Sequence, residues 1–191
     1  RFPICITKRL KIITMKHFIY LLILLATFSI TSCETDIPEN DDTAPEFSFK
    51  ITGDGFSHTF DQDDDFENFQ LNLRADAEYN FILTGSDQGG VEVIQWQLPS
   101  SDYIEFVTSI PNPWTISNIS ILTRMIQWQG DENNPLTGSI LNGTFEANGQ
   151  NIILSFGFYV SDFGGESGSS NTVSKELNLY IGNHNTEIIE F

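Results

Sequence analysis

The sequence predicts an all-β protein built from two packed antiparallel sheets. Apolar residues recur at every second position through most of the chain after residue 44, as in "FSFKIT", "NIILSFGFYV" and "VSKELNLYI". Only a β-strand places such a set on one face. Clusters of glycine, proline, asparagine and aspartate separate these stretches and are typical of turns. We find no stretch with convincing helical spacing.

The expected strands follow one another with short polar connections. In the first, Phe47, Phe49 and Ile51 share a face. Further strands are expected at 69–74, 79–84, 91–98, 103–107, 116–128 with a break inside it, 138–146, 152–160 and 173–181. The pair Asn148-Gly149 suits a type I′ turn and predicts that the two strands on either side of it form a hairpin. Seven to nine short strands with polar outer faces make a β-sandwich.

Two stretches of the chain resemble a known family. "ILTGSDQGGVEVIQWQLP" resembles the B strand, BC loop and C strand of bacterial immunoglobulin-like domains, with Val91 entering the sheet and Trp96 as the core tryptophan. "FGFYVSDFGGESGSSNTVSKELNLYI" resembles their final F and G strands and the glycine- and serine-rich FG loop. Residues 99–137 match nothing in the family, and the two sheet-bridging cysteines of antibody-type domains are absent.

The resemblance implies one immunoglobulin-like antiparallel β-sandwich over residues 46–191. It leaves the exact topology open, since fibronectin-like and cadherin-like variants have the same pattern. Such domains act as spacers, adhesive modules or binding modules, and the fold alone does not choose among these roles.

The N-terminal part has the pattern of a signal peptide. Met15-Lys16-His17 and the apolar run "FIYLLILLATFSI" form a basic n-region and a short h-region. A bilayer span needs about 20 apolar residues, so this run is too short for a lasting transmembrane helix. We therefore take Met15 as the expected start and 15–32 as the signal peptide. Residues 1–14 either lie upstream of the start or extend the n-region.

Ile30-Thr31-Ser32-Cys33 resembles the lipobox of bacterial lipoproteins, in which the cysteine receives the lipid and becomes the first residue. The resemblance implies a lipidated Cys33 and a protein held at the outer membrane, at the cell surface or on the periplasmic face. The other cysteine, Cys5, lies in the discarded part, so no intramolecular disulfide is expected.

The charge of the mature chain excludes several partners. All 26 acidic residues follow Cys33, whereas only four basic residues do, which gives a formal charge of −22. Nucleic-acid binding needs a basic stripe and is therefore not expected. Docking on anionic headgroups is disfavoured for the same reason. A glycan, an envelope protein or a cation remains as a candidate partner.

Residues 33–45 are expected to be an acidic linker. Between Glu34 and Glu46 there are six acidic residues, two prolines and no basic residue, a composition typical of a solvated tether. Acidic residues directly after the lipidated cysteine also resemble the surface-export signals of some Gram-negative lipoproteins.

Two loops share the pattern S-D-x-G-G, at 86–90 and 161–165. If they are the BC and FG loops they lie at the same end of the sandwich, where Asp87, Asp162 and Glu166 would converge on a hard cation such as calcium. The alternative is turn chemistry alone, in which aspartate closes an Asx-turn and glycine takes a positive φ.

A second acidic stretch, "DQDDDFE" at 61–67, opens like a calcium loop. Phe66 stands where such a loop requires glycine, and Asn72 stands where it requires a bidentate glutamate. The stretch is therefore expected to be a solvated acidic loop.

Aromatic side chains offer one more candidate site. Trp114 lies beside two prolines in "IPNPWTIS", so we expect it to be exposed and to contact a ligand together with Phe163. Trp96 is expected in the core.

Catalysis finds little support in the sequence. The mature chain has two histidines, His58 and His184, and no serine stands in a nucleophile elbow. We expect a non-catalytic module without a resident cofactor. A carbohydrate-binding accessory lipoprotein of a glycan-uptake system and a calcium-dependent adhesive module remain as alternatives.

Overall fold

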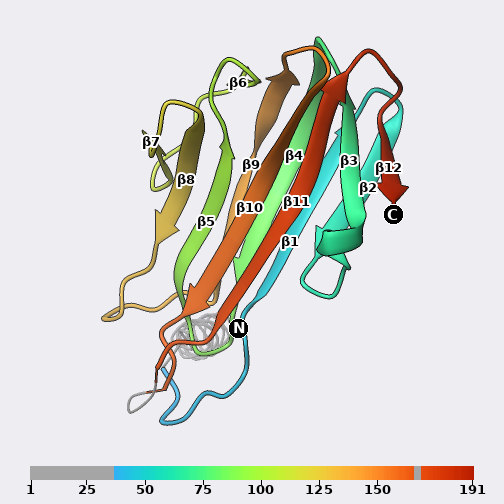
Figure 1. Ribbon diagram of the computed structural model, residues 1–191. Coiled ribbons are helices and arrows are strands. Elements are labelled where there is room, and N and C mark those ends of the chain that lie inside the picture. Colours follow the sequence, from blue (N-terminus) through green and yellow to red (C-terminus); the bar gives the residue numbers. More distant parts are fainter. Residues whose placement is uncertain (1–36, 166–168) are drawn as a thin grey trace, which may run out of the picture. The chain divides into compact units, whose positions relative to one another are not determined.

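The structure is a computed structural model and describes residues 37–165 and 169–191, which form two facing β-sheets (Figure 1). The five-stranded sheet has the order β2 (Phe56–Asp61), β1 (Glu46–Gly53), β4 (Ala77–Ser86), β9 (Gly138–Ala147) and β6 (Ile104–Phe106). The seven-stranded sheet has the order β12 (Glu187–Glu190), β3 (Phe69–Arg74), β11 (Thr172–Gly182), β10 (Ile152–Asp162), β5 (Val91–Pro99), β8 (Thr123–Gln129) and β7 (Thr115–Asn118). One short 3-10 helix, η2 (Phe66–Asn68), precedes β3.

The strand order confirms the expected fold class. Strands β1, β4, β9 and β6 lie in the order A, B, E and D of an immunoglobulin sandwich, and β11, β10, β5 and β8 lie in the order G, F, C and C′. Two details differ from the expectation. The described part of the chain has twelve strands rather than seven to nine. In addition, β3 pairs with β11 in parallel, so the sandwich is not wholly antiparallel.

An aromatic cluster fills the space between the sheets. Trp96 is fully buried, as expected, and its ring centroid lies 5.1 Å from that of Phe49, 5.0 Å from that of Phe81 and 5.0 Å from that of Phe156. These residues come from β5, β1, β4 and β10, so the cluster joins both sheets. Each such pair adds about 0.5–1.5 kcal/mol beyond its buried area. The core can therefore hold the fold without a disulfide.

The expected hairpin between 138–146 and 152–160 is wrong. β9 pairs with β4 and β6, whereas β10 pairs with β5 and β11, so the two strands lie in different sheets. Residues 148–151 form the turn, with Gly149 at a φ of 126° and Asn151 at a φ of 53°. The turn residues permit a tight reversal. Each strand, however, belongs to a different sheet and buries its alternating apolar face from there, so the chain crosses from one sheet to the other at this turn.

Two edge strands were not expected. β2 pairs with β1, and β12 pairs with β3, so the C-terminal stretch after His184 is not a free tail. β2 carries His58 between two phenylalanines, which interrupts its apolar alternation. β12 is only four residues long. Short edge strands are stabilised by pairing rather than by a pattern of their own.

Candidate functional site

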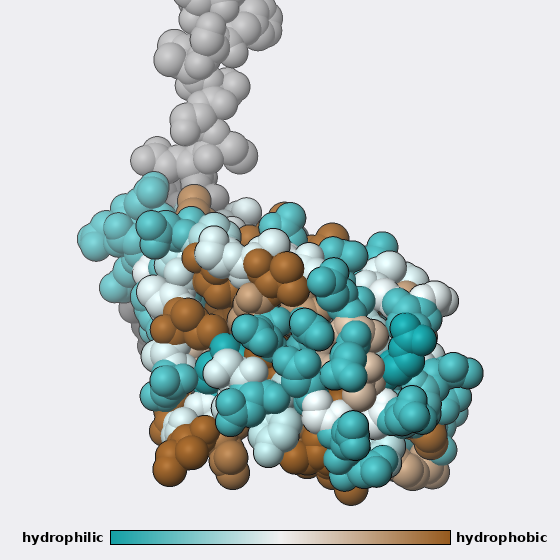
Figure 2. Space-filling model, turned by 90° about the horizontal axis from the view of Figure 1, so that it is seen from above, coloured by the Kyte–Doolittle hydropathy of each residue, from teal (hydrophilic) through white to brown (hydrophobic). Residues whose placement is uncertain are grey.

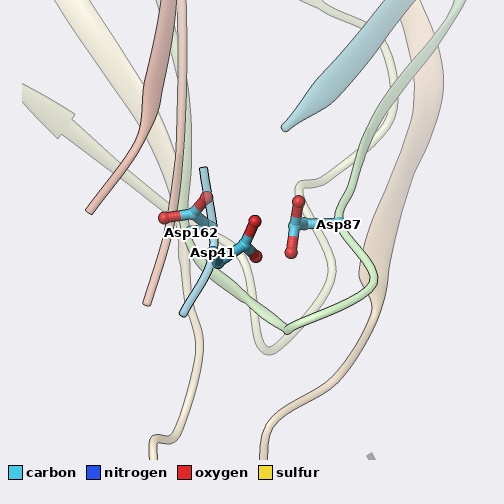
Figure 3. A group of neighbouring side chains, drawn as sticks. All are labelled: Asp41, Asp87 and Asp162. Carbon is cyan, nitrogen blue, oxygen red and sulfur yellow. The ribbon is translucent and has the colours of Figure 1, made fainter. Parts of the chain in front are cut away.

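The 86–90 and 161–165 loops lie at the same end of the sandwich, as expected, and we call this end the loop end (Figure 1). Asp87 and Asp162 are joined there by Asp41. Each of the three contributes a carboxylate oxygen, and these oxygens lie within 4.8 Å of one another (Figure 3). We call these three residues the aspartate cluster. Among residues 37–165 and 169–191, it is the one group of three or more histidine, cysteine, aspartate or glutamate side chains that lie close enough together to hold a metal ion.

Asp162 is the best-supported member of the cluster. Its side chain is fully buried at the end of β10. Its Oδ1 accepts hydrogen bonds from the backbone N–H of Gly164 at 2.8 Å and of Asn171 at 2.7 Å, and its Oδ2 accepts one from Asn171 Nδ2 at 2.9 Å. These donors replace the water that the carboxylate loses on burial. Asp162 therefore closes the loop between β10 and β11.

Asp87 lies in a less favourable environment. Its Oδ1 accepts one hydrogen bond from the N–H of Gly89 at 2.7 Å. Burial raises the pKa of Asp87, and the neighbouring carboxylates of Asp41 and Asp162 raise it further. By contrast, hydrogen bonds from the hydroxyl and N–H of Thr43 lower the pKa of Asp41.

The glycines of both loops make room for the chain that leads into β1. A Cβ on Gly89 would lie 2.7 Å from Pro38, and a Cβ on Gly165 would lie 2.7 Å from the backbone of Asn40. The neighbouring glycines, Gly90 and Gly164, have φ values of 106° and 65°. In each S-D-x-G-G motif, one glycine thus permits the turn and the other permits close packing.

Residues 37–45, which we call the leading segment, are therefore not a free tether, and that expectation is wrong for them. Asn171 Nδ2 donates to the backbone oxygen of Asp41 at 2.9 Å, and Pro45 is buried. The acidic composition hid this docking, because the contacts are made largely by backbone atoms and prolines. The sequence therefore did not identify Asp41 as a member of the cluster, nor Asn171 as the residue that holds the leading segment in place.

The cluster has two possible chemical roles. Three carboxylates are suitable ligands for a hard cation, which takes six to eight oxygens. The same carboxylates also act as acceptors that fasten two loops and the leading segment together, and the hydrogen bonds to Asp162 fully account for its burial. Glu166, the third expected ligand, lies outside the described residues.

The acidic stretch at 61–67 is held by its own hydrogen bonds. Asp64 accepts from the N–H of Asp61 at 2.9 Å, and Asp61 accepts from the N–H of Asp63 at 2.9 Å. Asp65 accepts from the side chain of Asn68 at 2.7 Å. These local contacts match the expected acidic loop.

Trp114 is buried, with 3 % of its surface exposed, so the expectation that it is exposed is wrong. Although its neighbours are prolines, the large apolar ring joins the core at the edge of the sandwich. Trp96 and Trp128 are buried as well, so the tryptophans offer no stacking platform. Phe163 is half buried and packs over Gly90 and Gly130.

The two histidines lie apart from the aspartate cluster in the sequence and make few polar contacts. His58 packs against the rings of Phe56 and Phe60. His184 stacks on Tyr180, with ring centroids 5.0 Å apart, and its Nδ1 pairs with the backbone oxygen of Asn185. In the part of the chain that the structure describes, neither ring hydrogen-bonds to a hydroxyl or a carboxylate.

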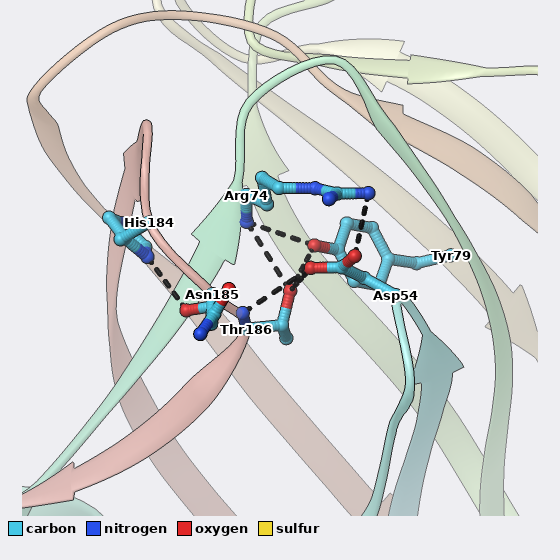
Figure 4. Close-up of polar contacts among 6 residues, drawn as sticks. All are labelled: Asp54, Arg74, Tyr79, His184, Asn185 and Thr186. Atoms are coloured by element: carbon cyan, nitrogen blue, oxygen red, sulfur yellow. Dashed lines mark hydrogen bonds and ion pairs between the residues drawn. The ribbon is translucent and has the colours of Figure 1, made fainter.

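A polar network fastens the other end of the sandwich, which we call the opposite end (Figure 4). The buried hydroxyl of Tyr79 lies 2.5 Å from that of Thr186 and accepts the N–H of Arg74 at 2.9 Å. Thr186 donates to Asp54 at 2.9 Å, and Asp54 pairs with the guanidinium of Arg74 at 2.6 Å. Burial raises the pKa of Tyr79. Sequence reasoning missed this network, because its members are far apart in the chain.

No family model and no curated protein matches this sequence. Within the described residues, no helix is long and apolar enough to cross a membrane.

Proposed function

We propose that this chain is a lipid-anchored protein of the envelope of a Gram-negative bacterium, with an immunoglobulin-like sandwich that serves as a non-catalytic binding or structural module. Cys33 carries the lipid in this proposal, and the protein is held at the outer membrane, facing the cell surface. A single acyl chain binds a membrane only marginally, so two or more chains would be needed for a stable anchor.

One observation supports this arrangement more than any other. The leading segment is docked on the loop end, and Ile37, its first residue, follows Cys33 by only four positions. A lipid on Cys33 would therefore hold the loop end close to the membrane. The opposite end and the outer faces of the sheets would remain free for a partner.

The proposal is tested by following the lipid. Cells that express the full chain are grown with an alkyne-bearing fatty acid, and the protein is isolated and checked for the label. We expect the parent chain to be labelled and to sediment with the membranes. Cys33→Ala and Cys33→Ser should lose the label and the membrane association.

Cys5→Ala is the matched control and should keep both. Label that persists in both Cys33 variants, or a parent chain that is never labelled, would contradict the proposal. Protease treatment of intact cells then separates the two orientations, because only a surface-exposed sandwich is accessible to the enzyme.

A further inference from the structure

The outer face of the seven-stranded sheet contains a groove of about 610 Å³. Ligand sites in proteins commonly have volumes of about 300–1,000 Å³. The groove lies between strands that part from each other. β10 pairs with β5 as far as Gly157 and Gln97, yet β10 begins at Ile152 and β5 continues to Pro99. The unpaired ends leave a depression between them.

Gly157 lowers the floor of this groove. It lies between Gln97 on β5 and Glu176 on β11, and its side of the strand faces outward with Ser155 and Tyr159. A Cβ on Gly157 would meet Gln97 at 3.4 Å, which is an ordinary contact. The packing of the fold therefore does not require a glycine at this position. Its lack of a side chain does leave space for a ligand.

Uncommitted polar groups line the groove. Among the described residues, no hydrogen-bond partner is found for the side chains of Gln97, Ser155, Tyr159, Ser174 and Asn178. They present amide and hydroxyl groups, which both donate and accept hydrogen bonds. Elsewhere on this sheet, amides pair with one another, as Gln70 does with Asn72 at 2.8 Å.

The groove carries little charge, although the domain is strongly acidic. Lys175 and Glu176 are its charged residues. The ammonium of Lys175 turns away, since it lies 5.6 Å from the ring centroid of Phe66 and donates to the backbone oxygen of Asp64. One carboxylate thus remains on a face of amides and hydroxyls. The acidic domain would repel an anionic ligand.

Apolar side chains border the polar floor. Leu122 is 62 % exposed on one side of the groove, and Ile153 is 72 % exposed on the other. Both lie toward the opposite end of the sandwich, where Figure 2 shows brown hydrophobic residues among the teal hydrophilic ones. A ligand with hydroxyl groups at its edges and apolar C–H faces would satisfy both kinds of surface.

We propose that this groove binds a neutral saccharide chain. Amides and hydroxyls would hydrogen-bond to its hydroxyl groups, and Tyr159, Leu122 and Ile153 would pack against its C–H faces. The proposal rests on the proposed function, since it names the ligand of a module whose loop end is turned toward the membrane. In that arrangement the loop end, packed by the leading segment, faces the membrane, whereas the groove lies on an outer sheet face that stays open to a partner.

The experiment measures binding of the detergent-solubilised full chain to polysaccharides in native affinity gels. The neutral probes are an α-glucan, a β-glucan, a xylan, a mannan and a galactan, and the acidic probe is polygalacturonate. We expect at least one neutral probe to retard the protein and polygalacturonate to have no effect. Binding of none of the neutral probes, or of the acidic probe alone, would overturn the proposal.

Gly157→Val fills the groove with a residue that suits a strand, and should weaken binding by about tenfold or more. Asn178→Ala should weaken it by about fivefold, since it removes one hydrogen bond. Asn142→Ala, on the outer face of the other sheet, is the matched control and should bind like the parent chain. Equal melting temperatures would show that the variants are folded.

Three results distinguish this proposal from a different binding site, a different class of ligand and a failure of the lipid anchor. If Gly157→Val binds the glycan like the parent chain, the glycan binds elsewhere, and the assignment of its site to the groove is overturned. Retardation by an extended neutral peptide, but by no glycan, would overturn the ligand class. A parent chain that is labelled at Cys33 but binds no glycan would count against the groove alone. A chain that binds a glycan but is never lipidated would count against the proposed lipid anchor alone.

Discussion

At the residue scale, buried polar groups decide how the two ends of the sandwich are held. Asp162 at the loop end and Tyr79 at the opposite end are both fully buried, and both are hydrogen-bonded to the protein. A buried polar group costs about 1–3 kcal/mol when its partner is lost. Single substitutions at these positions should therefore be much more damaging than substitutions of similar groups on the surface.

Tyr79→Phe should lower the free energy of unfolding by about 1–2 kcal/mol, because the N–H of Arg74 keeps only its longer contact, 3.4 Å to the hydroxyl of Thr186, and that hydroxyl loses a partner. Urea denaturation measures the change. Tyr180→Phe is the control, since Tyr180 hydrogen-bonds to Asn151 at an exposed site, and it should change stability by less than about 0.5 kcal/mol. Equal effects of the two variants would show that the network contributes nothing specific.

Asp87→Asn should stabilise the protein at neutral pH by a few tenths to about 1 kcal/mol. The folded-state pKa of Asp87 is raised by burial, so the folded state binds a proton more tightly than the unfolded state does. Stability from this group is therefore greatest at low pH and falls as the pH rises through the raised pKa. The variant removes this cost and can keep the hydrogen bond from Gly89.

The measurement is thermal unfolding in chelator from about pH 3 to 8, and the advantage of Asp87→Asn should shrink as the pH falls through the folded-state pKa and vanish below the unfolded-state pKa. Asp42→Asn makes the same charge change on an exposed residue and should show a smaller advantage. A variant that is less stable than the parent at neutral pH would mean that the charge of Asp87 is needed, as in a cation site.

At the element scale, most strands could be predicted from the sequence because their apolar alternation is strong. The strands from Phe47 to Ile51 and from Phe69 to Arg74 were predicted on that basis, and so was the break between β7 and β8. The pairing of β9 and β10 could not be predicted, because the Asn148-Gly149 turn suits a hairpin as well as a crossing between sheets. Pairing depends on contacts that are remote in the sequence.

The candidate site was predictable to a similar degree. The two S-D-x-G-G loops could be placed together because the B–C and F–G connections of this fold lie at one end. Asp41 could not be found, because nothing in an acidic stretch distinguishes a docked carboxylate from a solvated one. The groove left no signal either, since its residues are ordinary polar positions and its shape depends on where β10 and β5 part.

Asn171→Ala should release the leading segment from the loop end. The side chain donates to the backbone of Asp41 and to the carboxylate of Asp162, and alanine removes both contacts. Cleavage after Glu39 by a glutamate-specific protease should become at least about threefold faster, since cleavage follows local opening. Asn142→Ala should leave the rate unchanged. An unchanged rate in Asn171→Ala would mean that the docking does not depend on this amide.

At the scale of the whole molecule, the excess of acidic residues opposes the compact fold. Four basic residues face 26 acidic ones after Cys33, and Arg124 lies at the edge of the sandwich, where it donates to the backbone oxygens of Pro99 and Ile104. Within the described residues, a single ion pair joins two side chains, those of Arg74 and Asp54. Most of the carboxylates therefore repel one another through the solvent.

Raising the salt concentration from about 0.01 M to about 1 M shortens the Debye length from about 30 Å to about 3 Å. The melting temperature should rise by roughly 2–8 °C, which corresponds to a gain of about 1–2 kcal/mol. Sodium and potassium chloride should act alike. A variant with Asp42, Glu67, Glu132 and Glu187 changed to amides should respond less, and a melting temperature that falls with salt would contradict this account.

The anchor at Cys33 is the central claim of the account, and the mass of the mature N-terminus tests it most directly. The protein is extracted from membranes with detergent, digested, and its N-terminal peptide is identified by mass spectrometry. We predict a peptide that begins at Cys33 and carries the mass of acyl chains on that residue. A peptide that begins elsewhere, or an unmodified Cys33, would contradict the account.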